Sequence, residues 1–584
     1  MDRPERVPVS RRTLLKGLGA GAVGGAALLG IASQPDPDQG SNGTTAPGPQ
    51  TDRTGTGPAT SPGDPTATPT ERTTTEPPRP ERRGVTFDRS VDVVADFDAD
   101  PTGTRPVNRA IESAMEPGTL LTFPPGTYQL APQTIQIRHD RIGFLGAGDV
   151  TWRFADGFHG RFINCERDEF VFEGIDLDTG SHPAMSGHMR LFVPSRFYVG
   201  DVAYIGRGQG PGYAIKPAIT DSSTGRGTIR NFRVPHGARP DMYESATSGI
   251  KGNGRIGLYA GQPHVGILEV LDCEFSEFGN NGIYASRTRG DVRVEDSYFL
   301  NNGGNGIRLS GEGSWAKRCT VEVDTRKYDG PPMETSWGTW GITCENSRGG
   351  LTTEEYPVRS PGMVIEDCDV VLAHIDEGGQ VGAGIRLGSK GRQLRVRNTR
   401  IQVDVEDGFG RSTHAVLRVN PYLDHRQFRA DMPNPPKPHA IHLEDVEITG
   451  SAAGASAVRI AHAEGSTVRN CRVRQPGRDR DGVRFIQTRD STLDGGSIRT
   501  TGYPLVVNVD SSGRFVTLRN EPELVALAHE DGQVIESVQA EDGVVSLGSL
   551  DGIPEATINV TDYSGGNVYG TLEPASSGGD GGSS

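Results

Sequence analysis

Short alternations of apolar and polar residues recur along most of the chain. In Cys273-Glu274-Phe275 and Ser297-Tyr298-Phe299, a small residue, a polar residue and an aromatic residue follow one another. This order is typical of a strand that buries one face, because successive side chains of a strand point to opposite sides. The other members of this first column are Ile175-Asp176-Leu177, Phe232-Arg233-Val234, Cys319-Thr320-Val321, Cys368-Asp369-Val370, Thr399-Arg400-Ile401, Val446-Glu447-Ile448, Cys471-Arg472-Val473 and Gly496-Ser497-Ile498.

A second column of short strands follows the first. Its members begin with a small residue and then alternate apolar and polar positions. Each repeat therefore supplies at least two short strands separated by turns. The members are Gly257-Leu258-Tyr259-Ala260, Gly282-Ile283-Tyr284-Ala285, Gly306-Ile307-Arg308-Leu309, Gly341-Ile342-Thr343-Cys344, Gly384-Ile385-Arg386-Leu387, Ala415-Val416-Leu417-Arg418-Val419, Ala457-Val458-Arg459-Ile460 and Gly482-Val483-Arg484-Phe485.

The spacing of the first column predicts the fold. Cys273 and Ser297 are 24 residues apart, Ser297 and Cys319 are 22 apart, and Cys471 and Gly496 are 25 apart. Short strands at this spacing, with no helix between them, predict an all-β protein, a parallel β-helix whose coils stack by ladder hydrogen bonds. Leucine-rich repeats are disfavoured because their Leu-x-x-Leu-x-Leu pattern is absent, and βαβ units need longer crossovers.

The cysteines belong to this repeat. Cys273, Cys319, Cys368 and Cys471 share one inward position of the first column, where they act as small core residues. Neither a CxxC motif nor a Cys/His metal spacing is present. Cys319 and Cys368 are expected on neighbouring coils about 4.8 Å apart, so two free thiols and a disulfide are both compatible with the sequence.

The ends of the chain differ in composition from its middle. Residues 1–33 contain Ser10-Arg11-Arg12-Thr13-Leu14-Leu15-Lys16 before a Gly/Ala-rich apolar run, which resembles a prokaryotic twin-arginine export signal. Residues 34–83 are rich in Thr and Pro and are expected to be a disordered linker. We expect the β-helix at residues 84–510, a C-terminal β cap or small β appendage at 511–575, and a disordered tail at 576–584.

Export would place the protein outside the cell or on the cell surface. The mature chain is then expected to have no membrane span, unless the signal remains uncleaved as an anchor. The net charge is −15 and the pI is near 5.4, which disfavours a nucleic-acid partner because phosphate binding needs a basic surface. Glycine accounts for 80 of 584 residues, roughly double the usual share, which indicates many turns.

The segment from Asp96 to Gly148, with Phe123-Pro124-Pro125-Gly126-Thr127-Tyr128 at its centre, resembles the start of the pectate-lyase superfamily. The resemblance implies a right-handed parallel β-helix, a short capping helix over Val107–Met115, and activity on an acidic polysaccharide. One departure is that Arg105-Pro106-Val107 replaces the usual Asp-Asp-Thr before the helix, so no subfamily is implied.

Motifs that mark particular enzymes of that superfamily are absent or altered in this chain. The polygalacturonase-like set and the Asp-Pro-His-Glu motif of alginate epimerases are absent. Arg233-Val234-Pro235-His236-Gly237-Ala238-Arg239 is similar to the Arg-x-Pro-x-x-Arg motif of pectate lyases, with one residue too many. Arg239 is therefore a candidate catalytic residue, although a turn beside a strand would explain the segment equally simply.

A second candidate site begins at Asp176 and Asp178. Their spacing places both carboxylates on the outward face of one strand, where they are candidate ligands for Ca²⁺ or a candidate acid and base pair. Together with His182, His188 or Arg190 they would supply the cation and the base that β-elimination from a uronate requires. Outward acidic residues on a solvated coil are the simpler explanation.

The third candidate is an outward stripe on the second column. Stacked coils would align aromatic and cationic side chains, which suit an anionic glycan because arginine pairs with carboxylate or sulfate. Ion pairs with acids on the adjacent face are the alternative. Trp337 and Trp340, in an insertion, are further candidate sugar platforms. The stripe consists of Tyr259, Tyr284, Arg308, Arg386, Arg418, Arg459 and Arg484.

The leading hypothesis from the sequence is an exported β-helix protein that binds an anionic polysaccharide; whether it also cleaves the polymer is left open, and lyase chemistry is the expected route if it does. Two alternatives remain at this stage: a non-catalytic surface or adhesion protein that uses the coil as a rigid rod, and a glycoside hydrolase of the same fold.

Overall fold

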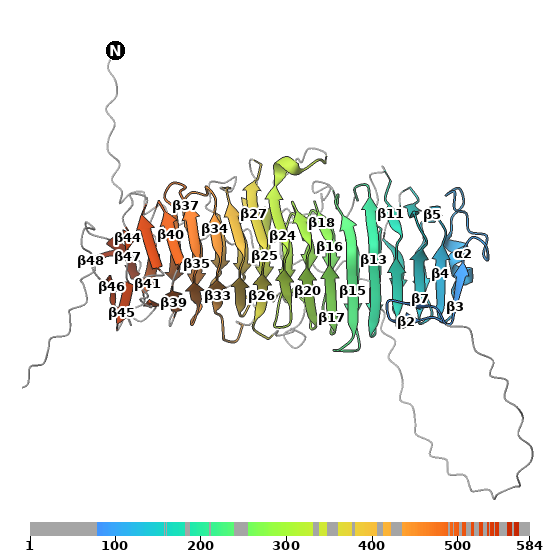
Figure 1. The fold of residues 1–584 in the computed structure, drawn as a ribbon, viewed down its shortest axis with the longest axis horizontal. Coiled ribbons are helices and arrows are strands. Elements are labelled where there is room, and N and C mark those ends of the chain that lie inside the picture. Colours follow the sequence, from blue (N-terminus) through green and yellow to red (C-terminus); the bar gives the residue numbers. More distant parts are fainter. Residues whose placement is uncertain are drawn as a thin grey trace, which may run out of the picture.

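The computed structural model confirms the parallel β-helix, with coils stacked into a rod (Figure 1). We expect the coil to be right-handed, because connections between parallel strands almost always are. The structure describes residues 79–156, 158, 160–180, 187–208, 212–238, 255–330, 338–346, 360–376, 380–405, 413–421, 435–486, 488, 491–494 and 496–501, and the backbone of strands between 505 and 571. The signal segment, most of the linker and the tail lie outside these residues.

Each coil contributes a strand to each of three faces, which we call sheets 1, 2 and 3 in the order in which the chain runs through them. Strands β13 (Arg196–Ile205) and β15 (Arg226–Val234) are long enough to run through both sheet 1 and sheet 2. The sequence predicted the strands of sheets 2 and 3 as its two columns. Sheet 1 contains the third strand of each coil, which neither column included.

Sheet 1 contains, besides β13 and β15, β3 (Arg89–Asp92), β4 (Thr119–Phe123), β7 (Ile142–Gly146), β10 (Phe170–Glu173), β17 (Ile267–Leu271), β20 (Asp291–Glu295), β23 (Trp315–Lys317), β26 (Met363–Glu366), β30 (Leu394–Arg397), β33 (Ile441–Glu444), β36 (Thr467–Arg469), β39 (Ser491–Asp494) and β42 (Val516–Leu518).

Sheet 2 contains, besides β13 and β15, β5 (Gly126–Leu130), β8 (Val150–Phe154), β11 (Asp176–Asp178), β18 (Glu274–Ser276), β21 (Tyr298–Leu300), β24 (Thr320–Asp324), β27 (Asp369–His374), β31 (Arg400–Val403), β34 (Glu447–Thr449), β37 (Arg472–Gln475), β40 (Gly496–Thr500) and β43 (Val525–His529).

Sheet 3 contains β6 (Ile135–Ile137), β9 (Arg161–Cys165), β12 (His188–Val193), β14 (Tyr213–Ile219), β16 (Ile256–Tyr259), β19 (Ile283–Tyr284), β22 (Asn305–Leu309), β25 (Gly338–Cys344), β29 (Ala383–Leu387), β32 (His414–Arg418), β35 (Ser456–Ala461), β38 (Asp481–Ile486), β41 (Leu505–Val509), β47 (Thr557–Asp562) and β48 (Gly566–Thr571).

The N-terminal end of the coil is covered as the sequence predicted. Helix α2 (Asn108–Ala114) buries Ile111 and Ala114, with Val107 and Met115 as its cap residues. A hairpin of β1 (Glu81–Arg82) and β2 (Val85–Thr86) also packs on the coil, so the fold begins within the segment expected to be linker. A cap is needed here because an open coil end exposes strand edges and core.

A buried carboxylate fixes the hairpin to sheet 1. Glu173 accepts hydrogen bonds from Arg82 Nε at 2.6 Å and from Arg83 Nε at 3.0 Å. Val85 and Phe87 pack beside it against Leu120 of β4. The hairpin is therefore part of the folded unit.

At the C-terminal end, parallel pairing continues beyond Val509. Strands β42 and β43 pair with β39 and β40, and β47 pairs with β41, all in parallel. The antiparallel pairs that follow involve β44 (Val534–Ile535), β45 (Val538–Glu541), β46 (Val544–Leu547) and β48. In the described part of the chain, no helix is long and apolar enough to cross a membrane.

The corner between sheets 1 and 2 is a tight bend with left-handed backbone. Asp, Asn and Gly adopt positive φ more readily than other residues, which explains their recurrence at this position. At Gly146 a Cβ atom would lie 1.9 Å from the carbonyl oxygen of Gly174, so the coils approach too closely for a side chain there. The corner residues with positive φ are Gly174, Asp201, Asn231, Asp272, Asp296, Arg318, Asp367, Asn398, Asp445 and Asn470.

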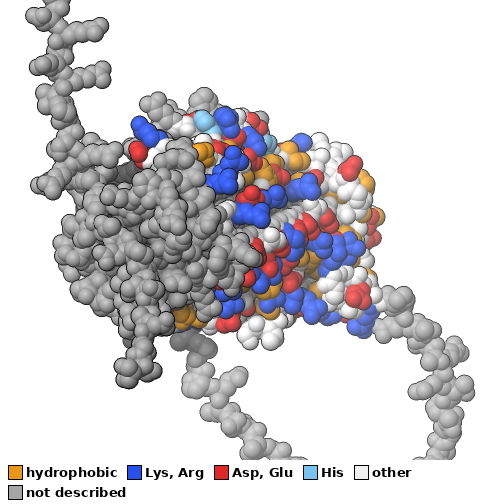
Figure 2. All heavy atoms as spheres, turned by 60° about the vertical axis from the view of Figure 1, so that its left-hand side comes forward, with side chains coloured by type: hydrophobic (Ala, Val, Ile, Leu, Met, Phe, Trp, Pro, Cys, Tyr) orange, Lys and Arg blue, Asp and Glu red, His pale blue; other side chains and the backbone are white. Residues whose placement is uncertain are grey.

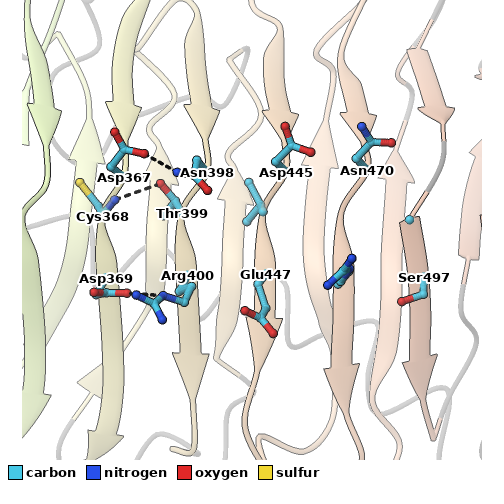
Figure 3. Close-up of a pocket in the computed structure, with 13 residues that line it drawn as sticks. Asp367, Cys368, Asp369, Asn398, Thr399, Arg400, Asp445, Glu447, Asn470 and Ser497 are labelled. Carbon is cyan, nitrogen blue, oxygen red and sulfur yellow. Dashed lines mark hydrogen bonds and ion pairs between the residues drawn. The ribbon is translucent and has the colours of Figure 1, made fainter. Parts of the chain in front are cut away.

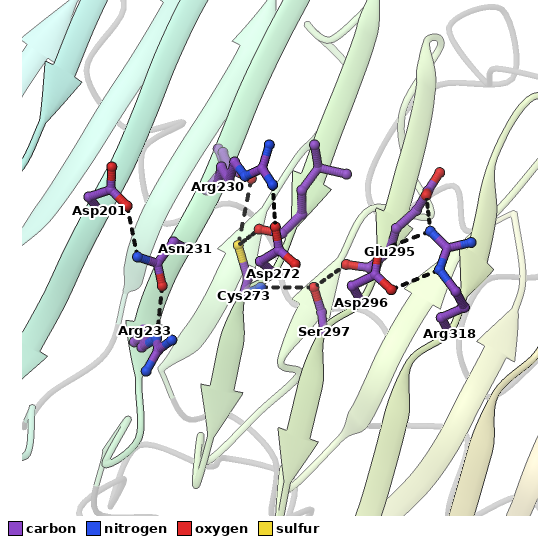
Figure 4. Close-up of polar contacts among 12 residues, drawn as sticks. Asp201, Arg230, Asn231, Arg233, Asp272, Cys273, Glu295, Asp296, Ser297 and Arg318 are labelled. Atoms are coloured by element: carbon purple, nitrogen blue, oxygen red, sulfur yellow. Dashed lines mark hydrogen bonds and ion pairs between the residues drawn. The ribbon is translucent and has the colours of Figure 1, made fainter.

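Side chains at this corner form hydrogen bonds to the neighbouring coil. Asn231 donates to Asp201 at 2.8 Å, and Arg318 donates to Asp296 at 2.7 Å and 2.9 Å (Figure 4). Further along, a shallow groove of about 870 Å³ runs between Asp367 and Asn470 (Figure 3). Among its lining residues, Asp367, Asp369, Asp445 and Glu447 outnumber Arg400 and Arg472, so its net charge is negative.

Charges alternate in sign from coil to coil along one column of sheet 1 and part of one column of sheet 2, although Arg196 pairs with Arg226 on sheet 1 and Arg474 with Arg499 on sheet 2. On sheet 2, Asp369, Arg400, Glu447 and Arg472 follow one another in register, and Asp369 pairs with Arg400 at 2.9 Å. Figure 2 shows acidic and basic side chains interspersed on the coloured surface that is visible in that view. The sheet 1 column consists of Glu295, Lys317, Glu366, Arg397, Glu444, Arg469 and Asp494.

All six cysteines are buried free thiols, so Cys319 and Cys368 are not joined by a disulfide. The backbone N–H of Cys273 donates to Ser297 Oγ at 3.0 Å, which confirms the inward column of small residues (Figure 4). Burial raises the pKa of Cys273, Cys344 and Cys471 to about 12, which suppresses the reactive thiolate.

We therefore expect the thiols to react with a disulfide reagent only after unfolding. Labelling the native protein at neutral pH should modify no cysteine within minutes, and six should react in denaturant without reductant. A count below six in denaturant would contradict the free thiols, and rapid native labelling would contradict their burial.

Candidate functional site

The outward side chains of sheet 3 form a column in which every charged member is cationic. Arg190 pairs with Lys216, and the pairing of Ile215 with Leu258 places Lys216 beside Tyr259. The register confirms that the predicted stripe residues stack, except for Arg418. The sheet-3 column consists of Arg190, Lys216, Tyr259, Tyr284, Arg308, Thr343, Arg386, Leu417, Arg459 and Arg484.

The placement of Arg418 in the stripe is wrong by one residue. Leu417 pairs with Arg386, while Arg418 pairs with the inward Leu387 and is fully buried. Its guanidinium donates to the carbonyl oxygens of Gly388 at 2.7 Å, Val419 at 2.9 Å and His439 at 3.1 Å. Arg418 therefore holds the coil together and is not a surface cation.

The middle of the sheet-3 column is buried. Tyr259, Tyr284, Arg308 and Arg386 are 6%, 4%, 2% and 4% exposed, so in this structure they do not present an open binding surface. The Arg308 guanidinium lies 4.6 Å from the Tyr284 ring centroid, and that of Arg386 lies 4.6 Å from the Trp340 ring centroid. Trp340 is itself buried, and Trp337 lies outside the described residues.

One carboxylate serves both buried arginines. Glu345 Oε2 accepts from Arg308 Nη2 at 2.8 Å and lies 3.3 Å from Arg386 Nη1. Burial still lowers the pKa of Arg386. The column thus retains closely spaced cations at an electrostatic cost.

Both ends of the column reach the surface. At one end, Arg190 pairs with Glu166 and donates to Asn164 at 2.7 Å beside an open hollow of about 460 Å³. At the other end, Arg459 and Arg484 are partly exposed. Burial, followed by repulsion from Arg484, lowers the pKa of Arg459.

Long connections enter or leave sheet 3, whereas the corner between sheets 1 and 2 is short. Strand β15 ends at Val234 and β16 begins at Ile256, while β32 ends at Arg418 and β33 begins at Ile441. Strand β17 ends at Leu271 and β18 begins at Glu274. Binding residues commonly lie on connections held by a rigid scaffold, so sheet 3 is the best-placed face for function.

The structure does not bring the predicted elimination site together. Asp176 and Asp178 lie on β11 of sheet 2, whereas His188 and Arg190 lie on β12 of sheet 3. His188 is buried, with its ring 5.8 Å from that of Tyr213. His182 and Arg239 lie outside the described residues.

The two aspartates also fit Ca²⁺ poorly. Asp178 Oδ2 accepts from Arg153 Nε at 3.0 Å and its Oδ1 from the backbone of Gly180 at 2.8 Å. Asp176 Oδ1 accepts from the N–H of Ala203 at 2.8 Å, and burial raises the pKa of Asp176. Calcium needs six to eight oxygen ligands, and an arginine already neutralises one of these carboxylates.

A cluster that the sequence did not predict lies in the turns between sheets 2 and 3. We call it the Glu277 cluster; it consists of Arg207, His236, Glu277 and Asp329. Arg207 Nη2 lies 2.5 Å from Glu277 Oε2 and 2.6 Å from Asp329 Oδ1. His236 Nδ1 lies 3.3 Å from Asp329 Oδ1 and 3.6 Å from Glu277 Oε2.

Register explains the convergence. Val234 pairs with Phe275, and His236 and Glu277 each follow two residues later. In the described part of the chain, His236, Glu277 and Asp329 are the group of metal-ligating side chains close enough to share an ion. Arg207 already lies between the two carboxylates, however, and balances their charge.

Comparisons with known proteins found similar solved structures but no match by sequence. No protein-family model matches the chain, and no curated protein matches it by sequence. Among solved structures, it is similar to the A-module of mannuronan C-5 epimerase AlgE6 of Azotobacter vinelandii, with 13% identity and a TM-score of 0.42 over 75% of this chain and 99% of that one.

Two further solved structures show the same level of similarity. PfbA, a surface adhesin of Streptococcus pneumoniae, is 10% identical, with a TM-score of 0.40 over 81% of this chain and 100% of that one. The catalytic unit of a GH87 alpha-1,3-glucanase from Streptomyces thermodiastaticus is 13% identical, with a TM-score of 0.35 over 78% of this chain and 65% of that one. These similarities carry no conclusion about what the chain binds.

Proposed function

We propose that the protein binds an anionic polysaccharide along the outward face of sheet 3. One observation carries the proposal. Charges alternate in sign along the column from Glu295 to Asp494 on sheet 1 and from Asp369 to Arg472 on sheet 2, whereas those members of the sheet-3 column that are charged are all cationic. Like charges stacked about 4.8 Å apart repel, and an external anion would add to the compensation that Glu166, Glu345 and Asp481 supply within the protein.

The length of the column favours a polymer. Nine steps between neighbouring strands separate β12, which carries Arg190, from β38, which carries Arg484. At about 4.8 Å a step, the two ends lie about 43 Å apart. A ligand that contacts Arg190, Arg459 and Arg484 together must therefore be a chain.

The chemistry of the column favours carboxylate or sulfate groups. Arginine binds these groups through paired hydrogen bonds. The buried cations of the middle would add a long-range attraction without touching the ligand. The net charge of −15 disfavours nucleic acid, and the resemblance of the N-terminal segment supports an acidic polysaccharide.

Cleavage by β-elimination is not part of this proposal, because the residues predicted for it lie on different sheets. The export of the protein to the surface, its use as a rigid rod and the role of Ca²⁺ at Asp176 remain predictions from the sequence. Unsaturated uronate, detected by its ultraviolet absorbance, would identify a lyase.

The proposal is tested with the full chain and a panel of polymers. Polygalacturonate, alginate, hyaluronan and heparin should be bound to different extents, and added salt should weaken the binding. Neutral dextran is the control and should not bind. Binding to none of the acidic polymers, or equal binding to dextran, would overturn the proposal.

A further inference from the structure

We infer that the open hollow beside Arg190 is a subsite for one acidic sugar residue of the bound polymer, an inference that rests on the proposed function for its ligand. We call it the Gln136 hollow. Its volume of about 460 Å³ falls within the range of about 300–1,000 Å³ that is typical of small-molecule sites. The lining consists of Gln136, Ile137, Arg138, Asn164, Glu166 and Arg167.

The hollow lies where the sheet-3 column begins. Gln136 of β6 pairs with Asn164 of β9, and Asn164 pairs with Arg190 of β12. In the described part of the chain, β6 is the terminal strand of sheet 3. A polymer that follows the column from Arg484 past Arg190 therefore makes its last contacts with this sheet in the hollow.

Two arginines of the hollow have no acidic partner. Arg138 and Arg167 are exposed, and in the described part of the chain neither forms an ion pair. Glu166 is the only acid of the lining, and it pairs with Arg190. An external carboxylate or sulfate can bind Arg138 and Arg167 without breaking an internal ion pair, and the arginine fork suits both groups.

The acids that follow these arginines along the chain have other partners. Asp140 Oδ1 accepts from the backbone N–H of Asp168 at 2.9 Å, and Asp168 Oδ1 accepts from that of Ser195 at 2.9 Å. The groove between Asp367 and Asn470 provides a contrast, because acids outnumber bases there. An anionic sugar is therefore expected in the Gln136 hollow and not in that groove.

Two amide side chains also line the hollow, and their contacts hold them in place. Asn164 Nδ2 donates to Gln136 Oε1 at 2.8 Å, and Asn164 Oδ1 accepts from Arg190 Nη1 at 2.7 Å. The Arg190 guanidinium lies 3.8 Å from the centroid of the Phe192 ring, which restricts it further. Among the described residues, none accepts from Gln136 Nε2, so this group can donate to a ligand.

The combination of arginines and amides fits a uronate or a sulfated sugar. An arginine binds the acidic group through paired hydrogen bonds, and an amide binds a hydroxyl of the same sugar. Ile137 is the only apolar residue of the lining, which disfavours an apolar ligand. A few polar groups held at fixed positions are what orients a ligand in its site.

Short oligomers test the hollow apart from the rest of the column. The probes are trimers prepared from polygalacturonate, alginate, hyaluronan and heparin, which are too short to reach from Arg190 to Arg484. For the trimer that wild type binds most tightly, Arg138→Ala, Arg167→Ala should weaken binding about tenfold. The matched control, Arg400→Ala, Arg472→Ala, removes the same charge from sheet 2. It should stay within about twofold of wild type at 0.1 M salt, where distant charges are screened.

Two further variants separate a direct contact from a loss of folding. Glu166→Gln removes the only acid of the lining and should strengthen trimer binding about threefold, a gain that a misfolded chain does not give. Gln136→Ala leaves the charge of the hollow unchanged. It should weaken trimer binding without changing its dependence on salt, because the lost contact is an uncharged hydrogen bond.

The results separate the hollow from the proposed function. Equal trimer affinity for wild type and Arg138→Ala, Arg167→Ala would overturn the inference, and so would an equal loss in the sheet 2 control or a loss in Glu166→Gln. Binding of a full-length polymer without binding of any trimer would overturn it as well. Failure to bind any full-length polymer would instead overturn the proposed function, while a trimer held through Arg138 and Arg167 would still support the hollow.

Discussion

Replacement of Glu345 by alanine is expected to lower the free energy of unfolding by about 3–5 kcal/mol. Glu345 Oε2 lies 2.8 Å from Arg308 Nη2 and 3.3 Å from Arg386 Nη1, and both arginines are buried. Removing the carboxylate leaves two buried cations facing each other without compensation. Such a loss is far larger than that of a surface ion pair.

The measurement is denaturant unfolding of the variant and wild type. Glu366→Ala is the matched control, because Glu366 also joins two cations, Lys317 at 2.9 Å and Arg397 at 2.7 Å. It is partly exposed on sheet 1, so its loss should be below about 1 kcal/mol. Equal losses for the two variants would show that burial does not set the strength of the Glu345 contacts.

The double variant Arg459→Ala, Arg484→Ala is expected to weaken binding to an acidic polymer about tenfold at low salt. Each arginine lost removes about 0.7 kcal/mol of binding free energy, a value typical of partly exposed charge contacts. The salt dependence of binding should also become shallower. Titration of wild type and variant with the tightest-binding polymer of the panel measures both effects.

Arg400→Ala, Arg472→Ala is the control for this experiment. It removes the same charge from the exposed column of sheet 2, where acids alternate with bases. Its affinity should stay within about twofold of wild type. An equal loss in the two double variants would mean that net charge, and not the outward face of sheet 3, governs binding.

The fold was predictable because its signal repeats. Stacking places Phe275 against Phe299 and Ile283 against Ile307, and the same apolar positions recur in the sequence. The capping helix was predictable from one closely matching segment. The hairpin at Glu81–Arg82 was not, because a two-residue strand in a Pro-rich segment carries no periodic signal.

The site was predictable only in part. The stack of Tyr284 on Arg308 follows from sequence spacing, whereas the burial of both depends on what covers the face. Arg418 was misplaced because the direction of a side chain follows from ladder register, and an inward arginine needs three backbone acceptors that no local pattern reveals.

The Glu277 cluster was missed because its members lie in four separate turns between Arg207 and Asp329. The segment around His236 was interpreted through Arg239 instead, as a variant of the pectate-lyase motif. Alignment of the turn residues would have shown His236 above Glu277, since each follows a paired strand residue by two positions. Asp329 lies after a one-turn helix, η3 (Thr325–Lys327), and no repeat predicts its position.

The alternating charges of sheets 1 and 2 limit how this rod can change in length. Loss of the coil that carries Arg397 would place Glu366 directly beside Glu444, and like charges at that distance are unfavourable. Loss of two successive coils would restore an acid beside a base. We therefore expect the protein to tolerate the loss or gain of two successive coils, in evolution or by design, better than the loss or gain of one coil.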